Sequence, residues 1–297
     1  MAAKIAVIGA AHSNRPWRKT FSKNTFCMIA MGLLLPAAIV DAQQPAAASS
    51  ADSNSAAINA ANNPTTPKLT FEAQDYWMPS VYGLGGRDGS LGLQRNLIPI
   101  TTFGVQNIFH VILPVVTNPS PPEGTQTGLG GLQLYNLSLA HSRGTTYGLG
   151  PLVVLPTESN SSSGPEKWQA GFSGAVISSP HWGLAGALFT YQHAFGRGSG
   201  PDSQQETLQP LLHYNFPGGF YSRSTALWSF NSGSKIKDIP IGLGGGKVWK
   251  KFSNGKTINL YVEPQYSVWH SGVGVPRWQL FTGVNFQFPY GLKLWSK

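Results

Sequence analysis

Polar and apolar side chains alternate from residue 69 almost to the end of the chain, and no other feature restricts the fold as strongly. In 257–270, the alternate positions from Ile258 to Val268 are almost all apolar, and the interleaved positions are polar. The segments 205–216 and 277–290 show the same pattern. A β-strand with two different faces has a period of two, whereas a helix repeats about every 3.6 residues. The sequence therefore predicts an all-β chain.

Clusters of Gly, Pro, Asn and Ser separate these alternating segments, and such clusters favour turns. Eleven strands are expected at 90–100, 102–116, 128–141, 145–156, 166–178, 182–195, 205–216, 219–230, 239–250, 257–269 and 277–290. Single-chain bacterial barrels close with even strand numbers, so we expect a twelfth strand at 69–78, with ten strands as the alternative count. Short and long connections alternate along part of the chain, which is typical of a transmembrane barrel.

Charged residues make up only 11% of the chain, against about 25% in ordinary soluble domains. A soluble barrel would show charged faces to water, whereas the polar faces here are mostly Gln, Asn, Ser, Thr, Tyr and Gly. Lipid tolerates an apolar outer face, and a closed ladder leaves no backbone group unpaired. We therefore predict an antiparallel transmembrane β-barrel with a polar lumen and an apolar belt. A soluble β protein with an aromatic core is the alternative.

Aromatic residues gather near the expected strand ends, where interfacial girdles place such rings. They are Tyr76, Trp77, Tyr82, Trp168, Trp182, Tyr221, Trp249, Trp269, Trp278, Tyr290 and Trp295.

The N-terminus has the features of a secretory signal peptide. Basic residues at 15–23 precede a short apolar stretch at 26–40, and Val40-Asp41-Ala42 places a small residue at the expected cut after Ala42. An uncleaved anchor helix is the alternative. Removing 1–42 takes away the single cysteine, Cys27, and lowers the net charge from +9 to about +5, because five basic residues and one acidic residue are lost. An exported β-barrel is expected in the outer membrane of a Gram-negative bacterium.

The segment 43–68 is rich in Ala, Ser, Asn and Pro and has no periodic apolar pattern. We expect it to be a disordered tail. The predicted organisation is a signal peptide at 1–42, this tail at 43–68 and a barrel at 69–297.

Several segments carry a resemblance to a known family. They are Leu93-Gln94-Arg95-Asn96-Leu97-Ile98-Pro99-Ile100, 113–116, 148–151, 155–158, 167–171, Leu208-Gln209-Pro210-Leu211-Leu212-His213-Tyr214-Asn215 and 284–289. In this order, over roughly 90–290, the chain resembles the outer-membrane "transporter" family of the MetA pathway of phenol degradation. The resemblance implies a barrel that passes small, often hydrophobic or aromatic, compounds, and it brings no catalytic residues. The tail after Pro289 departs from the usual aromatic end of such barrels.

The sequence thus predicts a porin-like channel or transporter that passes small molecules by diffusion. A barrel of about 12 strands is only marginally wide once side chains fill its interior. The candidate lumen-lining residues are Gln209, His213, Asn215, Arg223, Asn259, Tyr261, Glu263, Gln265, Arg277, Gln279, Asn285 and Gln287. Glu263 and Arg277 lie on adjacent predicted strands and would pair across the lumen if both point inward. A non-conducting structural or adhesive barrel is the second interpretation, and a barrel-embedded hydrolase is the third.

No motif indicates an enzyme, a metal site or a cofactor. The glycines of 242–247 lack the first Gly and the final Ser or Thr of a phosphate-binding loop, and no histidines have zinc-ligand spacing. Lysines concentrated between 235 and 256 are expected to pair with lipid phosphates or lipopolysaccharide rather than with nucleic acid. The expected partners are outer-membrane lipid, lipopolysaccharide and a small solute, with the barrel as a monomer.

Overall fold

The structure is a computed structural model that describes residues 50–85, 87–120, 124–196, 198, 204–249, 256–289 and 292–293. Of residues 50–53, 120, 292 and 293 only the backbone is described. The expected signal peptide at 1–42 and the first part of the expected tail, 43–49, lie outside the described residues. None of the described residues form a helix long and apolar enough to cross a membrane.

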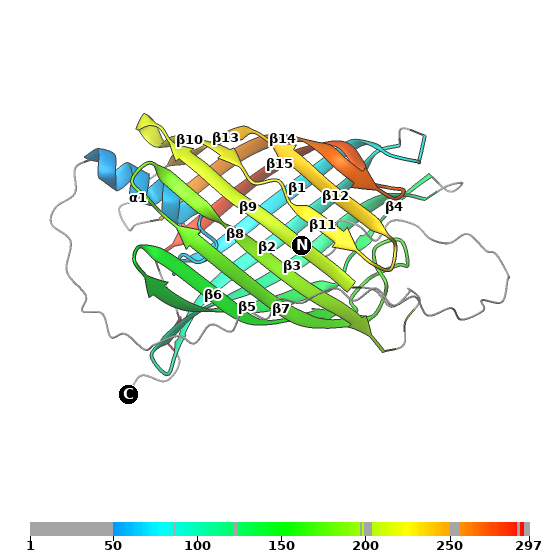
Figure 1. Ribbon diagram of the computed structural model, residues 1–297, viewed down its shortest axis with the longest axis horizontal. Coiled ribbons are helices and arrows are strands. Elements are labelled where there is room, and N and C mark those ends of the chain that lie inside the picture. The colour runs from blue at the N-terminus through cyan, green and yellow to red at the C-terminus, as the bar shows by residue number, and fades with distance from the viewer. Residues whose placement is uncertain are drawn as a thin grey trace.

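Sixteen strands form one sheet. Their bounds are β1 Leu69–Val81, β2 Gly89–Thr102, β3 Val105–Ser120, β4 Gly124–Leu129, β5 Leu132–Ser142, β6 Thr145–Leu155, β7 Trp168–Ser178, β8 Gly183–Phe195, β9 Gln204–Asn215, β10 Phe220–Ser224, β11 Trp228–Asn231, β12 Ile236–Gly242, β13 Gly244–Trp249, β14 Thr257–Ser271, β15 Pro276–Phe288 and β16 Leu292–Lys293. The sheet closes because β1 pairs with both β2 and β15. Figure 1 shows the tilted strands winding around the barrel.

Three pairs of strands each occupy a single position in the barrel wall. Both β4 and β5 pair with β3, both β10 and β11 pair with β9, and both β12 and β13 pair with β14. The two-residue β16 lies beside β2. The barrel is therefore a closed antiparallel one of 12 strands, which confirms the predicted fold class and the twelfth strand at the start of the sheet.

The connections differ between the two ends of the barrel. At the end where β1 begins and β15 ends, the links 103–104, 143–144, 179–182 and 216–219 are short. The φ angles are 50° at Phe103 and 80° at Gly104, and 47° at Arg143 and 75° at Gly144. Both two-residue hairpin loops therefore have the positive φ values of a tight primed turn. The longest link, 156–167, lies at the opposite end. We call these the turn end and the loop end.

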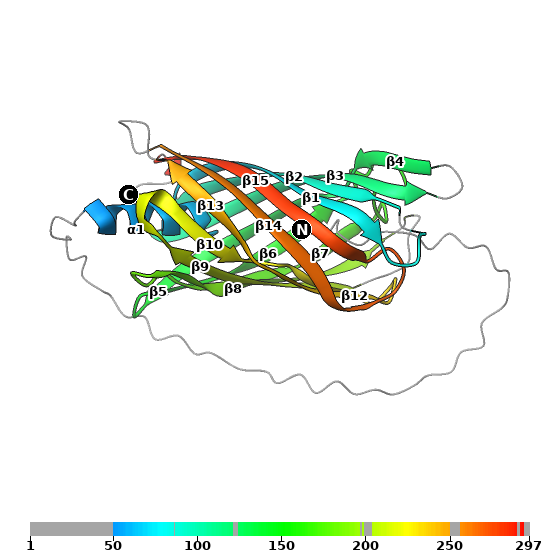
Figure 2. The ribbon, with the colours of Figure 1, turned by 90° about the horizontal axis from the view of Figure 1, so that it is seen from above.

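The expectation of a disordered tail is wrong for residues 50–62, which form a helix, α1 (Ser50–Asn62), at the turn end (Figures 1 and 2). Ala57, Ile58 and Ala61 are buried and belong to the same apolar cluster as wall residues of the barrel. An isolated helix of this length is marginal in water. The composition of the segment does not predict this helix, because the barrel, and not the segment itself, supplies the apolar surface that stabilises it.

The two faces of the wall differ in polarity. Outward side chains are apolar over most of the wall, and the exposed aromatic ones include Trp77, Trp168, Trp269 and Trp278. Of the aromatic residues expected at the strand ends, Tyr76 and Tyr221 are instead buried, and Tyr290 and Trp295 lie outside the described residues.

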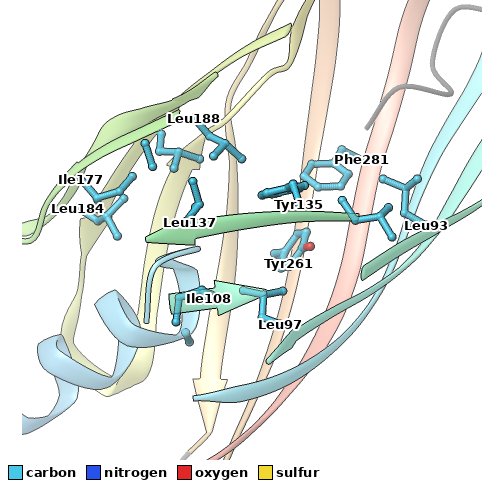
Figure 3. Packing of buried hydrophobic residues seen from close by; sticks show 14 of the residues in the cluster. Leu93, Leu97, Ile108, Tyr135, Leu137, Ile177, Leu184, Leu188, Tyr261 and Phe281 are labelled. Atoms are coloured by element: carbon cyan, nitrogen blue, oxygen red, sulfur yellow. The ribbon is translucent and has the colours of Figure 1, made fainter. Parts of the chain in front are cut away.

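The interior is not uniformly polar, contrary to our expectation. Buried leucines and isoleucines from β2, β3, β5, β7 and β8 face inward as one apolar wall (Figure 3). Its labelled members include Leu93, Leu97, Ile108, Leu137, Ile177, Leu184 and Leu188. Buried polar side chains are more numerous on the remaining strands, although β5, β7 and β8 also carry some, such as Gln133, Gln169 and Gln192, which hydrogen-bond to one another. Alternation predicts which residues share a face, but it does not specify how polarity is distributed around the barrel.

Candidate functional site

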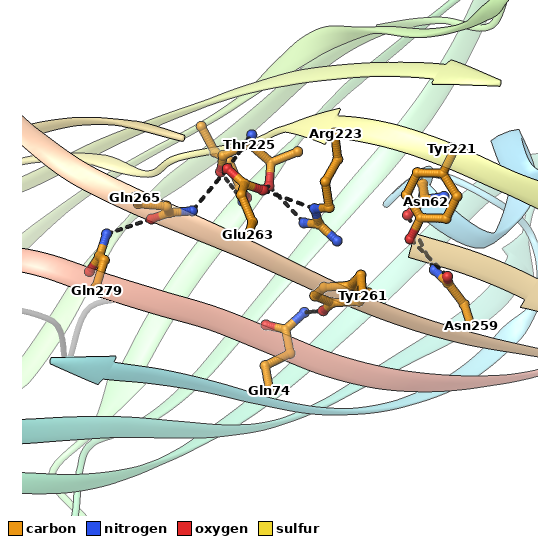
Figure 4. A network of polar contacts seen from close by, with 11 residues as sticks. Asn62, Gln74, Tyr221, Arg223, Thr225, Asn259, Tyr261, Glu263, Gln265 and Gln279 are labelled. Carbon is orange, nitrogen blue, oxygen red and sulfur yellow. Dashed lines mark hydrogen bonds and ion pairs between the residues drawn. The ribbon is translucent and has the colours of Figure 1, made fainter. Parts of the chain in front are cut away.

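A buried ion pair lies at the centre of the polar side of the lumen (Figure 4). Arg223 of β10 donates from Nε to Glu263 Oε2 of β14 at 2.9 Å, and the Glu263 carboxylate is 0% exposed. Thr225 completes the cluster, because its backbone N–H donates to Glu263 Oε1 at 2.8 Å and its hydroxyl donates to Oε2 at 2.7 Å. A buried carboxylate is stable only when its oxygens are paired and hydrogen-bonded, and both oxygens of Glu263 meet this condition.

Amides and a tyrosine extend this cluster along the wall. Gln265 Nε2 donates to Glu263 Oε1 at 3.0 Å, and Gln279 donates in turn to Gln265. The Arg223 guanidinium carbon lies 3.8 Å from the centroid of the Tyr261 ring, a cation–π contact. Figure 4 shows these side chains lying along the inner face of β14 and its neighbours.

A second ion pair from β1 and β2 lies next to the first cluster. Gln74 donates from Nε2 to the Tyr261 hydroxyl at 2.7 Å and to Glu72 Oε2 at 3.0 Å. Glu72 lies 3.6 Å from Arg95 Nη1. The two ion pairs balance in charge, so this wall offers many hydrogen-bonding groups and no net charge to a solute.

Glycines on the inner face of the wall make room for these side chains. A Cβ on Gly244 would lie 2.1 Å from the carbonyl oxygen of Val262 and 2.5 Å from Glu263 Cα. A Cβ on Gly246 would lie 2.4 Å from the Tyr221 hydroxyl, and one on Gly283 would lie 2.4 Å from the Tyr261 hydroxyl. The glycine-rich stretch around β13 therefore has a structural reason, which is the close approach of neighbouring side chains.

The helix α1 closes the turn end of the lumen. Asn215 Nδ2 donates to Asn59 Oδ1 at 2.9 Å, and Asn259 Nδ2 donates to Asn62 Oδ1 at 3.2 Å. The side-chain amides of Asn285 and Gln287 donate to the carbonyls of Ala61 and Ala60, both at 2.9 Å. Side chains from three wall strands thus hold the last turn of the helix.

A cavity of about 50 Å³ remains between the end of α1 and the polar cluster. Its lining includes Ala61, Asn62, Asn63, Pro64, Glu72, Arg95, His213, Arg223 and Tyr261. This volume accommodates only one or a few water molecules. In this arrangement the lumen is closed at the turn end.

The structure brings most of the predicted lumen-lining residues together. Ten of them are buried: Gln209, His213, Arg223, Asn259, Tyr261, Glu263, Gln265, Gln279, Asn285 and Gln287. Asn215 is half-buried and contacts α1. All of these lie on β9, β10, β14 or β15, where the alternating pattern is most regular.

Arg277 lies elsewhere, so the predicted pair with Glu263 is wrong. Its side chain is exposed at the loop end, with the guanidinium carbon 4.9 Å from the centroid of the Tyr82 ring. Glu263 is paired in the ladder with Phe281, four residues further into β15, and its ion-pair partner is Arg223. Alternation along β15 places Arg277 on the same parity as Gln279, but it does not determine how far along the barrel axis Arg277 lies.

Sequence reasoning missed Glu72, Gln74, Arg95 and Thr225. Glu72 and Gln74 lie on the same face of β1 as Thr70 and Tyr76. The alternation in 69–78 would therefore have predicted that these polar side chains point inward. Arg95 lies within a segment that carried the family resemblance. No local pattern marks Thr225, because it lies where the strand is interrupted between β10 and β11. Among the described residues, no three His, Cys, Asp or Glu side chains gather as a metal ion would require.

Fold and site together define a class: a closed antiparallel barrel of 12 strands of the outer-membrane type, with buried polar and buried apolar side chains distributed unevenly around its interior. The outer membrane channel of the COG4313 group from Pseudomonas putida F1 shares this fold, with 13% identity, a TM-score of 0.54, and coverage of 74% of this chain and 96% of that one. The β domain of the Bordetella autotransporter BrkA is also similar, with 13% identity, a TM-score of 0.45, and coverage of 75% and 100%.

No protein-family model matches the chain, and no curated protein matches it. Membership of the MetA-pathway family therefore stays a prediction, and what the COG4313 channel shares with this chain is the fold.

Proposed function

We propose that this chain, after removal of the signal peptide at 1–42, is a monomeric outer-membrane channel that passes small molecules by diffusion. The observation that carries the proposal is the lumen itself, in which a hydrogen-bonding wall around Arg223 and Glu263 faces strands β2 to β8, where buried apolar side chains outnumber buried polar ones. A barrel that served only as an anchor would need no such division. Outer-membrane lipid and lipopolysaccharide would contact the apolar outer face.

The two walls favour solutes that are themselves two-sided. A small aromatic molecule with a hydroxyl or similar polar group can place its ring on the apolar wall and its polar group on the amides. Tyr76 and Phe281 already stack inside the lumen with ring centroids 4.2 Å apart, so the interior accommodates flat rings. This agrees with the hydrophobic or aromatic compounds that the family resemblance implies.

The closed turn end favours a second candidate, a structural barrel that does not conduct. With α1 seated, the cavity of about 50 Å³ is too small for a solute larger than water. Transport through this barrel requires α1 to move aside, and a structural barrel requires it to stay. The two candidates therefore differ in one measurable property.

Conductance in planar bilayers separates them. The mature chain and a variant lacking residues 43–62 are compared, with a variant lacking only 43–49 as the matched control that keeps α1. We expect frequent open channels without α1 and rare, brief openings in the mature chain and the control. A silent barrel in all three preparations would exclude the channel and leave the structural role.

A further inference from the structure

The barrel wall is interrupted between β10/β11 and β12/β13. Residues 220–223 pair with 244–247, and 229–231 pair with 236–238, both in the same register. Positions 224–228 and 239–243, which that register sets opposite each other, are not paired. We call this interruption the seam. Pro240 on one side has no N–H to donate, so this ladder cannot be completed there.

On the other side of the seam the chain bends into the lumen. Thr225, Ala226 and Leu227 are all buried, which breaks the alternation of a strand. The bend is held from inside by side chains, because Gln209 Nε2 donates to the Thr225 carbonyl at 3.0 Å and the Thr225 N–H donates to Glu263. The Glu263 carboxylate thus occupies the place of a missing ladder partner.

Next to the seam, on the outer face of the paired strands β10, β13 and β14, lies a groove of about 710 Å³. Its walls include Phe216, Phe220, Leu260 and Val262, and its floor is the glycine stretch 244–246. Beside it, Ile241 and Leu243 are 57% and 71% exposed on the outer face. The groove is therefore apolar and opens toward the surroundings of the barrel.

Tyr261 lines both this outer groove and the cavity inside the lumen. At this point the interior and the outer face are separated by the paired strands β10, β13 and β14, because Gly246 pairs with both Tyr221 and Tyr261. Where two strands of the wall are paired, their backbone hydrogen bonds close it to a solute, and the unpaired stretch at 224–228 and 239–243 lacks them.

We propose that the seam is a lateral passage through which apolar solutes leave the lumen for the membrane hydrocarbon, closed at rest by the Glu263–Arg223–Thr225 cluster and Tyr261. The inference rests on the proposed channel function and adds an exit route to it. An apolar solute leaves an aqueous lumen for hydrocarbon favourably, and the seam separates segments joined by side chains rather than by a ladder.

The test joins the two sides of the seam with a disulfide, using Ser224→Cys together with Leu243→Cys, two positions that both face outward. The flanking register sets these positions opposite each other. The single native cysteine, Cys27, lies in the expected signal peptide, so one crosslink forms. The matched control is Val176→Cys with Ala187→Cys, a pair already joined in the ladder between β7 and β8. Folding of each full-length variant is checked by the mobility of the unheated barrel on a gel.

Two readouts distinguish exit into the membrane from conduction through the pore. The first is entry of the apolar dye N-phenylnaphthylamine into Gram-negative cells, followed by its fluorescence, and the second is ion conductance of the purified variants. With the seam crosslinked we expect dye entry to slow by about tenfold or more and to recover on reduction, because the gate can no longer open. Conductance should stay unchanged, and the control crosslink should alter neither readout.

Equal dye entry before and after reduction, with conductance present, would overturn the lateral passage while leaving the channel intact. Loss of both readouts in the unmodified chain would instead overturn the proposed channel. Should the crosslinked variant fail to fold, Gly245→Trp fills the outer groove without a disulfide. It should slow the dye with conductance unchanged, and unchanged dye entry in this variant would equally overturn the passage.

Discussion

The carboxylate of Glu263 accepts a hydrogen bond at 2.8 Å from the backbone N–H of Thr225, across a stretch of wall that has no strand pairing. A side chain of β14 thereby passes on the inner side of β12 and β13 and holds the link between β10 and β11, which is not paired with β14. The glycines at 242 and 244 make this reach possible, because a Cβ on Gly242 would lie 2.6 Å from Glu263 Oε1. The polar cluster is thus part of the wall as well as part of the lumen.

Removing Arg223 alone should be strongly destabilising. Arg223→Met leaves the buried Glu263 carboxylate without its cation, and breaking such a pair costs about 3–5 kcal/mol. The double variant Arg223→Met with Glu263→Gln should recover at least part of this loss, because no uncompensated charge remains. The urea midpoint of each variant in detergent, read from unheated gel mobility, measures the effect. Equal midpoints for the single and double variants would contradict this account.

Gly244→Ala should destabilise the barrel more than a matched change elsewhere. Its new methyl group meets backbone at 2.1 Å, whereas the nearest atom to a Cβ on Gly174 lies at 3.8 Å. Overpacking of this kind costs about 1–3 kcal/mol. The fraction of folded barrel in membranes, compared between Gly244→Ala and Gly174→Ala, tests the expectation. A Gly174→Ala variant that loses as much folded protein would show that glycine entropy, and not space, matters.

A disulfide between α1 and the wall should lock the turn end. Asn59→Cys with Asn215→Cys replaces a side-chain hydrogen bond of 2.9 Å. Oxidised protein should be silent in planar bilayers, and a reductant should restore the openings of the unmodified chain. Each single cysteine variant serves as the control. Openings that persist under oxidation, with the crosslink verified by mass, would show that α1 does not block the lumen.

The outward tryptophans should contact lipid. Trp168, Trp269 and Trp278 are 46%, 49% and 51% exposed on the outer face of the strands. In vesicles, brominated phospholipids should quench most of the tryptophan emission, and aqueous iodide should quench little of it, because rings of an aromatic belt lie at the lipid interface. The opposite order of quenching would argue for a barrel surrounded by water.

The loop 156–167 at the loop end should loosen as the pH rises. Ser159 joins it to β4, since the Ser159 N–H donates to the Leu129 carbonyl at 3.1 Å and the Ser159 hydroxyl accepts from the Leu129 N–H at 2.9 Å. Burial raises the pKa of the neighbouring Glu158 above its usual value, and the nearby Glu166 adds to this. The folded loop therefore favours the protonated form, and this stabilisation is present at low pH and lost as Glu158 ionises.

Limited proteolysis of this loop across acidic and neutral pH, corrected for protease activity on a peptide substrate, measures the change. In the Glu158→Gln variant the protease should cleave the loop slowly at every pH, because the amide of the glutamine stays neutral. A variant that keeps the wild-type pH dependence would assign the effect to another group.

Much of the fold was predictable because each strand of a barrel wall has its own alternation of polar and apolar residues, which can be seen in a short stretch of sequence. A strand with lipid on one face and a lumen on the other must alternate, so the segments 205–216, 257–269 and 277–290 could be assigned from parity alone. The same parity placed Gln209, Asn259 and Glu263 on the inner face, where the structure has them. Low charge and the closing strand at 69–78 then favoured a 12-strand barrel over a soluble one.

The parity of a residue along its strand does not determine its position along the barrel axis. It also does not determine which residues distant in sequence it contacts. The partner of Glu263 is Arg223 rather than Arg277 because strand tilt and register, which depend on every pairing around the barrel, set which side chains meet. The helix α1 and the seam likewise depend on contacts that exist only in the closed barrel. Ala57, Ile58 and Ala61 form a buried face only once the barrel surrounds them, and Thr225 gains a partner only where a strand leaves the ladder. The sequence by itself determined the strands and their faces, whereas closure of the sheet decided the contacts inside it, because those contacts join residues that only the completed barrel brings together.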